Sequence, residues 1–210
     1  MDVHSTHRPI HTWKDFLLHL LVVTIGLFIA LMLEAVVEAL HHRHIVREAR
    51  ENLRREIESN RGLYAQDVRR VQQNRARLAA DIEQLRNLRG GATVDRHALS
   101  CEWGWYGFSD ASWNSARDTG AVLYMDSRAV ERYSAIYAQQ RYVNDTAVAI
   151  ILDESRAQAP LLIAEDPARL TPAEIEAMLI DTARLHERLG ALQSFMKGLD
   201  KGYAEEIERR

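Results

Sequence analysis

An uncharged apolar run near the N-terminus restricts the fold of this chain more than any other feature. From Phe16 to Leu33 the chain reads FLLHLLVVTIGLFIALML, and only His19 and Thr24 in this run are clearly polar. A membrane-spanning helix needs about 20 mostly apolar residues. Trp13 precedes the run, at the position where an aromatic residue of the membrane interface is expected. We therefore predict one transmembrane helix over residues 13–40.

The apolar run has two other interpretations. A buried core helix of a soluble domain is one alternative. A cleaved signal peptide is the other, but the run is too long for one and no small-x-small cleavage site follows it.

The charges that flank the run bear on its orientation. Arg8 and Lys14 precede it, after which five arginines follow within the next 22 residues: Arg43, Arg47, Arg50, Arg54 and Arg55. The positive-inside rule applied to this count places the large domain in the cytoplasm. The same arginines also belong to a charged helix face, so the count leaves the orientation open.

The chain continues after the anchor without a helix breaker as far as the pair Gly90-Gly91. Apolar residues recur one heptad apart at Ile57, Tyr64, Val71, Leu78 and Leu85. Val68 and Ile82 fill part of the companion row, and arginines interrupt it. We predict a long amphipathic stalk helix over residues 41–89, continuous with the anchor. The alternative is two helices, broken near residues 41–44 or at Gly62.

The remaining residues, 90–210, predict a helical bundle that packs on the stalk. We expect short helices at about 95–119 and long helices at about 126–158 and 171–208, with Ala159-Pro160 ending the first of the long pair. The sequence Thr171-Pro172-Ala173-Glu174 is a capping box that starts the second. Because no strand pattern occurs, the predicted fold class is all-α, with an antiparallel bundle as the soluble domain after a tail of residues 1–12.

Apolar rows mark the faces that the long helices are expected to bury. The first row comprises Val130, Tyr133, Tyr137, Ala147 and Ile151. The second comprises Met178, Leu185, Leu189, Leu192, Met196, Leu199 and Tyr203. Beside it, Gly190, Ser194, Gly198 and Gly202 form a row of small residues, which would let another helix approach closely.

Composition narrows the function without naming it. The formal net charge of −3 gives no basic excess for binding nucleic acid, and Cys101 is the only cysteine. No nucleophile motif, phosphate loop or cysteine metal pattern is present. We therefore expect no catalytic activity and no cofactor.

Two stretches carry a resemblance to a known family. Residues Val22–Leu31 read VVTIGLFIAL and residues Ser112–Ala121 read SWNSARDTGA, with Tyr137 on the helix that follows. Together they resemble a bacterial family of membrane-anchored proteins of unknown function (DUF6090-like). The resemblance covers the anchor, the stalk and the middle of the chain, and it implies no enzyme activity. It also implies a bacterial inner membrane with the soluble domain in the periplasm, against the charge count.

Carboxylates and imidazoles at helical spacing stand where the anchor ends. Glu34, Glu38 and His42 share one face, and His41 lies beside them. Such groups can bind a divalent metal or relay protons, most readily if several helices bring them into a ring. The simpler interpretation is that they lie at the level of the lipid headgroups and face water.

Three other groups of residues are candidates for helix contact, for ligand or partner binding, and for a folding element. Gly26 and Ala30 form a small-xxx-small pair for helix contact within the membrane. The aromatic residues Trp103, Trp105, Tyr106 and Phe108 either line a ligand or partner patch or close one end of the bundle. Trp113, Ala116 and Gly120 share one helix face, which we interpret as a folding element.

These features favour a membrane-anchored, self-associating helical scaffold or interaction protein. Its expected partners are the lipid bilayer, further copies of the chain in a coiled-coil-like homo-oligomer, and a possible membrane protein. The first alternative is a sensor whose bundle binds a small ligand near the aromatic residues. The second is an oligomeric assembly that conducts ions or protons past Glu34 and Glu38.

Overall fold

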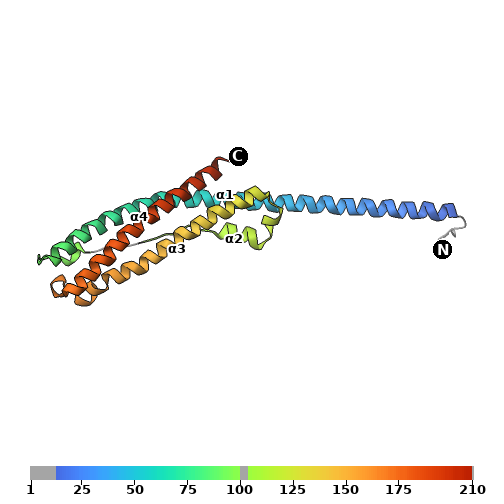
Figure 1. The fold of residues 1–210 in the computed structure, drawn as a ribbon. Helices are drawn as coiled ribbons and strands as arrows, with labels where there is room; N and C mark the ends of the chain where they lie inside the picture. The colour runs from blue at the N-terminus through green and yellow to red at the C-terminus, as the bar shows by residue number, and fades with distance from the viewer. Residues whose placement is uncertain (1–12, 100–103, 210) are drawn as a thin grey trace, which may run out of the picture. The chain divides into compact units, whose positions relative to one another are not determined.

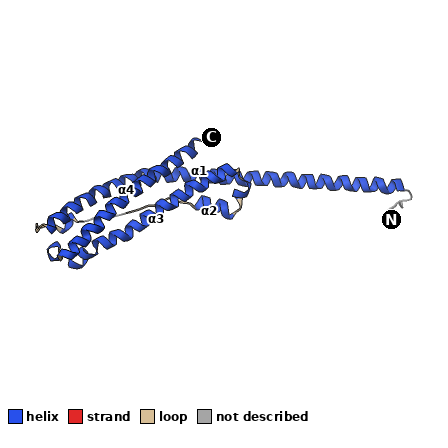
Figure 2. Ribbon diagram, viewed as in Figure 1, coloured by secondary structure: helices blue, strands red, loops and turns tan. Residues whose placement is uncertain are grey.

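The computed structural model describes residues 13–99 and 104–209. Within these ranges the chain forms four α-helices and three short 3-10 helices, and no strand occurs among them (Figure 1, Figure 2). The predicted all-α fold class is confirmed. Cys101 and Trp103 lie outside the described residues.

The longest helix, α1 (Trp13–Arg89), contains the predicted anchor and the predicted stalk without a break at residues 41–44 or at Gly62. Residue contacts divide the chain into two units, Met1–Glu48 and Ala49–Arg210. In the first unit, α1 holds one stretch that is long and apolar enough to cross a membrane, and none of that stretch is buried. The stretch is therefore not a core helix of the described chain.

The second unit is built from three long helical segments and a short one. They are α1 from Ala49 onward, α2 (Ala111–Asp118), α3 (Ser127–Ala164) and α4 (Pro172–Glu208). The 3-10 turns η1 (Arg96–Ala98), η2 (Ala121–Tyr124) and η3 (Pro167–Arg169) stand between them. Figure 1 shows α3 and α4 side by side, and their backbones make the most extensive contact between two elements.

Local sequence explains where these helices begin. The Asp126 side chain accepts a hydrogen bond from the Ala129 amide and caps α3. At α4 the capping box is complete, because the Thr171 hydroxyl accepts from the Glu174 amide while the Glu174 carboxylate accepts from the Thr171 amide. That hydrogen bonding holds the pKa of Glu174 below its usual value.

Helix α3 runs past Pro160, so the predicted end at residue 158 is wrong. Proline removes one backbone donor and usually disfavours a helix interior. Here Ala157 and Leu161 on either side of it are buried, and Glu165 closes the helix in the left-handed conformation with its amide bonded to the Leu161 carbonyl. Packing near the helix end thus outweighs the local signal.

In the region predicted to form short helices at about 95–119, the described residues form η1 and α2. The apolar row predicted for α3 needs correction. In α3 Ile150 is buried, at 1% exposure, whereas Ile151 of the predicted row is 39% exposed. By contrast, all seven residues of the α4 apolar row are buried.

Candidate functional site

A row of buried polar side chains runs along α1. Asn60, Asp67, Asn74 and Asp81 recur every seven residues, and their exposed fractions are 1%, 0%, 2% and 8%. They occupy the companion positions of the heptad that begins with Ile57. The predicted companion row, with Val68 and Ile82, lies one residue further along each heptad, and both of these residues are only partly buried.

Asn60 holds the extended segment that precedes α2. Its amide nitrogen donates to the Ser109 carbonyl at 2.8 Å, and its amide oxygen accepts from the Ser109 backbone amide at 2.9 Å. One side chain therefore satisfies both backbone groups of one residue, as a neighbouring strand would.

Asn144 on α3 does the same for the preceding residue. Its side chain accepts from the Phe108 amide at 3.1 Å and donates to the Phe108 carbonyl at 2.9 Å. Gln140, one turn earlier, donates to the Ser109 carbonyl at 2.8 Å, and its oxygen accepts from Asn60 and from the Tyr203 hydroxyl. We call Asn60, Gln140 and Asn144 the amide clasp.

Glu56 extends this polar contact to the start of α2. Its carboxylate accepts from the Ser109 hydroxyl at 2.8 Å, from the Ser112 amide at 2.9 Å and from the Tyr137 hydroxyl at 2.8 Å. An acidic group at a helix N-terminus satisfies a free amide and favours the helix dipole. Burial and the bond to Glu56 raise the pKa of Tyr137, so it stays a neutral donor.

The predicted helix face of α2 packs against this network. Trp113 and Ala116 are buried, and the Trp113 ring stacks on Tyr137 with centroids 5.6 Å apart and planes 5° from parallel. Gly120 follows α2 with φ at +75°, a conformation that glycine adopts without strain.

The aromatic residues of the predicted ligand patch have separate roles in the structure. Phe108 is buried edge-on against Tyr203, and the Trp105 indole donates to Asn144 at 3.2 Å. Tyr106 is exposed, with the Arg70 guanidinium 4.3 Å above its ring. The hollow described below is not lined by these residues.

Asp67 differs from the clasp because its carboxylate has no partner. Both oxygens are buried without a hydrogen bond. Burial raises the pKa of Asp67 to about 6, although Arg70 and the Tyr106 backbone act in the opposite direction. Burial likewise raises the pKa of Asp81 to about 6, against the effect of Arg77. Burial therefore moves the titration of both carboxylates upward, to just below neutral pH.

The carboxylates and histidines at the end of the anchor do not converge on one point. His42 Nε2 lies 3.9 Å from Glu38, and the rings of His41 and His42 are 6.3 Å apart. Among the described residues, no three histidine, cysteine or acidic side chains are grouped as metal ligands. Gly26, in the predicted membrane contact, has no atom within 4 Å of where a side chain would begin.

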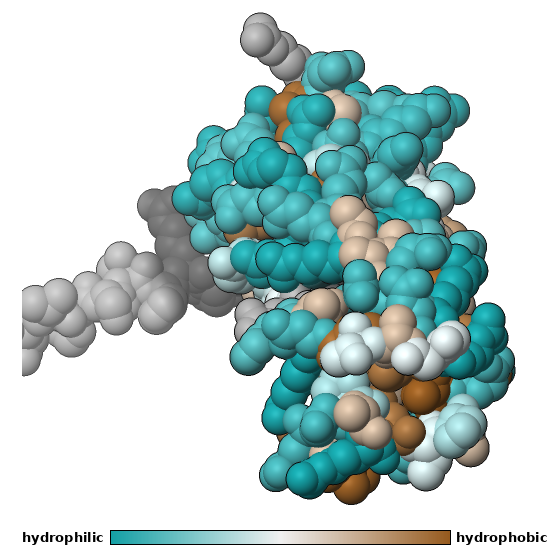
Figure 3. Space-filling view, turned by 90° about the vertical axis from the view of Figure 1, so that its left-hand side faces the viewer, coloured by the Kyte–Doolittle hydropathy of each residue, from teal (hydrophilic) through white to brown (hydrophobic). Residues whose placement is uncertain are grey.

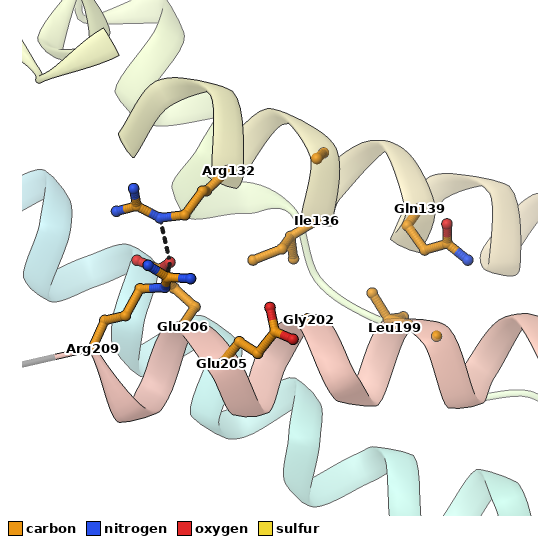
Figure 4. Close-up of a pocket in the computed structure, with 10 residues that line it drawn as sticks. Arg132, Ile136, Gln139, Leu199, Gly202, Glu205, Glu206 and Arg209 are labelled. Carbon is orange, nitrogen blue, oxygen red and sulfur yellow. Dashed lines mark hydrogen bonds and ion pairs between the residues drawn. The ribbon is translucent and has the colours of Figure 1, made fainter. Parts of the chain in front are cut away.

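An open hollow of about 260 Å³ lies between α3 and α4 (Figure 4). Gly198 and Gly202 lie on its α4 side and Ile136 on its α3 side, while Arg132 and Glu206 pair at 3.0 Å at one end. A side chain at Gly202 would begin 3.4 Å from Ile136, and one at Gly190 would begin 3.3 Å from Arg75. The small-residue row of α4 therefore accommodates side chains of α1 and α3 of the same chain.

The outward side of α3 carries an apolar stripe. Val148, Leu152 and Leu162 are 54%, 66% and 70% exposed, and Ile151 and Ile163 flank them at 39% and 81%. Figure 3 looks onto the end of the bundle where α3 turns into α4, and apolar side chains gather on its lower part. These five residues, the α3 stripe, are too many to be scattered exposed apolar residues.

Comparison with known proteins gave no matching family model, no matching curated protein and no matching solved structure.

Asn144→Ala will destabilise the bundle by about 2 to 4 kcal/mol, because the buried Phe108 amide loses its acceptor and the indole of Trp105 loses its partner. Chemical unfolding of the full chain in nonionic detergent measures the loss. The exposed Asn87→Ala serves as control and should change stability by less than about 0.5 kcal/mol. Equal effects of the two changes would contradict the clasp.

Asp67→Asn will stabilise the protein at pH 7.5. The folded pKa of about 6 lies above the ordinary value of 3.8, so this group favours folding below pH 4 and loses that contribution as the pH rises to 6. Removing the charge should add about 2 to 3 kcal/mol at pH 7.5 and almost nothing at pH 3.5. Unfolding curves at both pH values, with exposed Asp145→Asn as control, measure the difference. A gain that is independent of pH would show that the carboxylate is not perturbed.

Proposed function

We propose that this chain is a single-pass membrane protein whose helical bundle self-associates through the α3 stripe and serves as a scaffold or interaction module. The observation that carries the proposal is the stripe itself. Three stripe residues and two small residues between them form a seam with alternating steps of four and three residues: Val148, Leu152, Ser155, Ala159 and Leu162. That spacing is typical of the contact seam of a coiled coil.

The composition of the seam suits a second copy of the same helix. Large residues stand at both ends of the seam, and Ser155 and Ala159 between them allow close approach of two backbones. Ser155 also satisfies its own hydroxyl by donating to the Ile151 carbonyl, so it brings no unpaired polar group to the contact. A two-fold pairing of α3 with α3 would bury the stripe of each copy against the other.

The energetics of the contact fit an anchored protein. Burying one aliphatic side chain contributes about 1.5 to 3 kcal/mol, so the stripe offers several kcal/mol per copy. Free proteins lose much of this gain to the cost of association. Copies confined to one membrane have already lost part of that freedom, so a short seam suffices for them.

Leu152→Lys will weaken association at least tenfold, because it replaces an apolar residue of the seam by a charged one. The measurement is energy transfer between labelled copies of the full chain in lipid vesicles. The control is Leu123→Lys, since Leu123 is 80% exposed on η2 and lies outside the stripe. Circular dichroism checks that both variants fold. A wild-type chain that stays monomeric in vesicles at all densities would refute self-association.

We further propose that the membrane is a bacterial inner membrane and that the bundle lies in the periplasm. Support comes from the resemblance of the anchor and of residues 112–121 to a family with that arrangement. The charge count around the anchor supports the opposite orientation. The chain has three lysines, which makes the two arrangements easy to tell apart: Lys14 precedes the anchor, and Lys197 and Lys201 lie on α4.

A membrane-impermeant amine reagent applied to spheroplasts will label Lys201 and not Lys14. Lys201 is 79% exposed, so its reactivity reports which side of the membrane it is on. Peptide mass spectrometry identifies the labelled site, and permeabilised cells, in which Lys14 should also react, are the control. Labelling of Lys14 alone in intact spheroplasts would place the bundle in the cytoplasm.

A further inference from the structure

Asp67 and Arg70, one turn apart on α1, act on the same part of the extended segment that precedes α2. The Arg70 guanidinium donates to the Gly104 carbonyl at 3.3 Å and lies 4.3 Å from the centre of the Tyr106 ring. A side chain at Gly104 would begin 3.1 Å from Nη1 of Arg70, so glycine leaves the room that this contact needs. Arg70 therefore holds residues 104–106 on α1.

Asp67 lacks the partner that this neighbour could provide. It is 0% exposed, and both of its oxygens are buried without a hydrogen bond. Side chains three residues apart on a helix are neighbours and can form an ion pair. In the structure the segment engages the Arg70 guanidinium instead, which is the arrangement expected when Asp67 carries a proton and needs no cation.

Few groups act on the charge of Asp67. On α1 the group is Arg70, and on the segment it is the Tyr106 amide, which favours the ionised form although its geometry falls short of a hydrogen bond. No charged group of α3 or α4 contributes to the raised pKa of Asp67. Asp81, the other buried carboxylate of the row, lies two heptads further along α1, about 21 Å at 1.5 Å per residue.

We propose that Asp67 and Arg70, with Gly104 and Tyr106, form a pH-dependent latch. While Asp67 is protonated, Arg70 holds Gly104 and Tyr106 on α1. Once Asp67 is ionised, it takes Arg70 as its partner and releases both residues of the segment. Leaving a buried carboxylate charge unpaired costs more than giving up one hydrogen bond to a neutral carbonyl and a cation–π contact at an exposed ring.

The amide clasp keeps its hold in both states of the latch, because amide side chains do not titrate. Residues 108 and 109 therefore stay in place, and the release concerns the contacts of Gly104 and Tyr106 with α1. Because the pKa of Asp67 is about 6, the latch changes state between pH 5 and pH 7.5. It works within one chain and does not depend on pairing through the α3 stripe.

Double-mutant cycles on chemical unfolding of the full chain in nonionic detergent test this exchange of partners. The coupling between Arg70 and Tyr106, measured with Arg70→Gln and Tyr106→Leu, should change the unfolding equilibrium constant about fivefold at pH 5 and have almost no effect at pH 7.5. The coupling between Asp67 and Arg70, measured with Asp67→Asn and Arg70→Gln, should be absent at pH 5 and at least about tenfold at pH 7.5. Titration of Asp81 affects all four variants of a cycle alike and cancels.

The matched controls are two Asp→Asn changes. In the Asp67→Asn background, the coupling between Arg70 and Tyr106 should be equal at both pH values, because no carboxylate competes for the guanidinium. In the background of Asp145→Asn, at an exposed position of α3, the coupling should keep the pH dependence of the wild-type chain.

Three outcomes would overturn the latch. One is a coupling between Arg70 and Tyr106 that is equal at pH 5 and pH 7.5 in the wild-type chain. Another is the absence of coupling between Asp67 and Arg70 at pH 7.5. The third concerns hydrogen exchange of residues 104–107, which should be faster at pH 7.5 than at pH 5 after correction for the intrinsic effect of pH; slower exchange would mean that ionised Asp67 tightens the segment through the Tyr106 amide.

Discussion

The bundle depends on satisfying the backbone of an extended segment that runs among its helices. Residues 108 and 109 have no strand beside them, and buried amide and carbonyl groups without partners are costly. Asn60 and Asn144 supply those partners from opposite sides, each bonding both backbone groups of one residue. The same contacts fix α1 and α3 in register, since a shift of either helix by one residue would turn its amide away from the segment.

The buried polar residues of this α1 row differ in how well they are hydrogen-bonded, and so in their effect on stability. Asn60 is fully engaged, while Asp67 has no partner and the nitrogen of Asn74 is also without one. Polar residues in a helical seam commonly cost stability and in return exclude other registers. Asn60 fits that description, whereas Asp67 contributes a cost with no hydrogen bond to offset it. Residues of similar size in one row therefore stabilise or destabilise the bundle according to whether a hydrogen-bond partner lies opposite them.

Much of the fold was predictable because its signals are local or periodic. Three of these signals can be recognised within a few turns of helix. They are the apolar run of the predicted anchor, the capping box at Thr171 and the leucine-rich row of α4. The buried row of α1 also had a signal, the exact seven-residue spacing of Asn60, Asp67, Asn74 and Asp81. That spacing does not by itself predict burial, because asparagine and aspartate are mostly exposed in proteins. The partners of Phe108 and Ser109 had no local signal, because they lie 31 to 49 residues away in sequence.

The exposure of Ile151 shows which face of α3 points into the bundle and which points outward. The apolar residues of α3 form two neighbouring rows, and only the one with Ile150 turns inward. The row of small residues on α4 does not compete for external partners, since side chains of α1 and α3 already lie against it. Ile151 instead adjoins Leu152 on the outward side, where the described part of the chain leaves five large apolar residues exposed. Exposing such a stripe is unfavourable for a freely diffusing monomer. In the proposed anchored arrangement, the chain would meet further copies at high local density. The proposed pairing therefore uses the α3 stripe and not a surface that the bundle already fills.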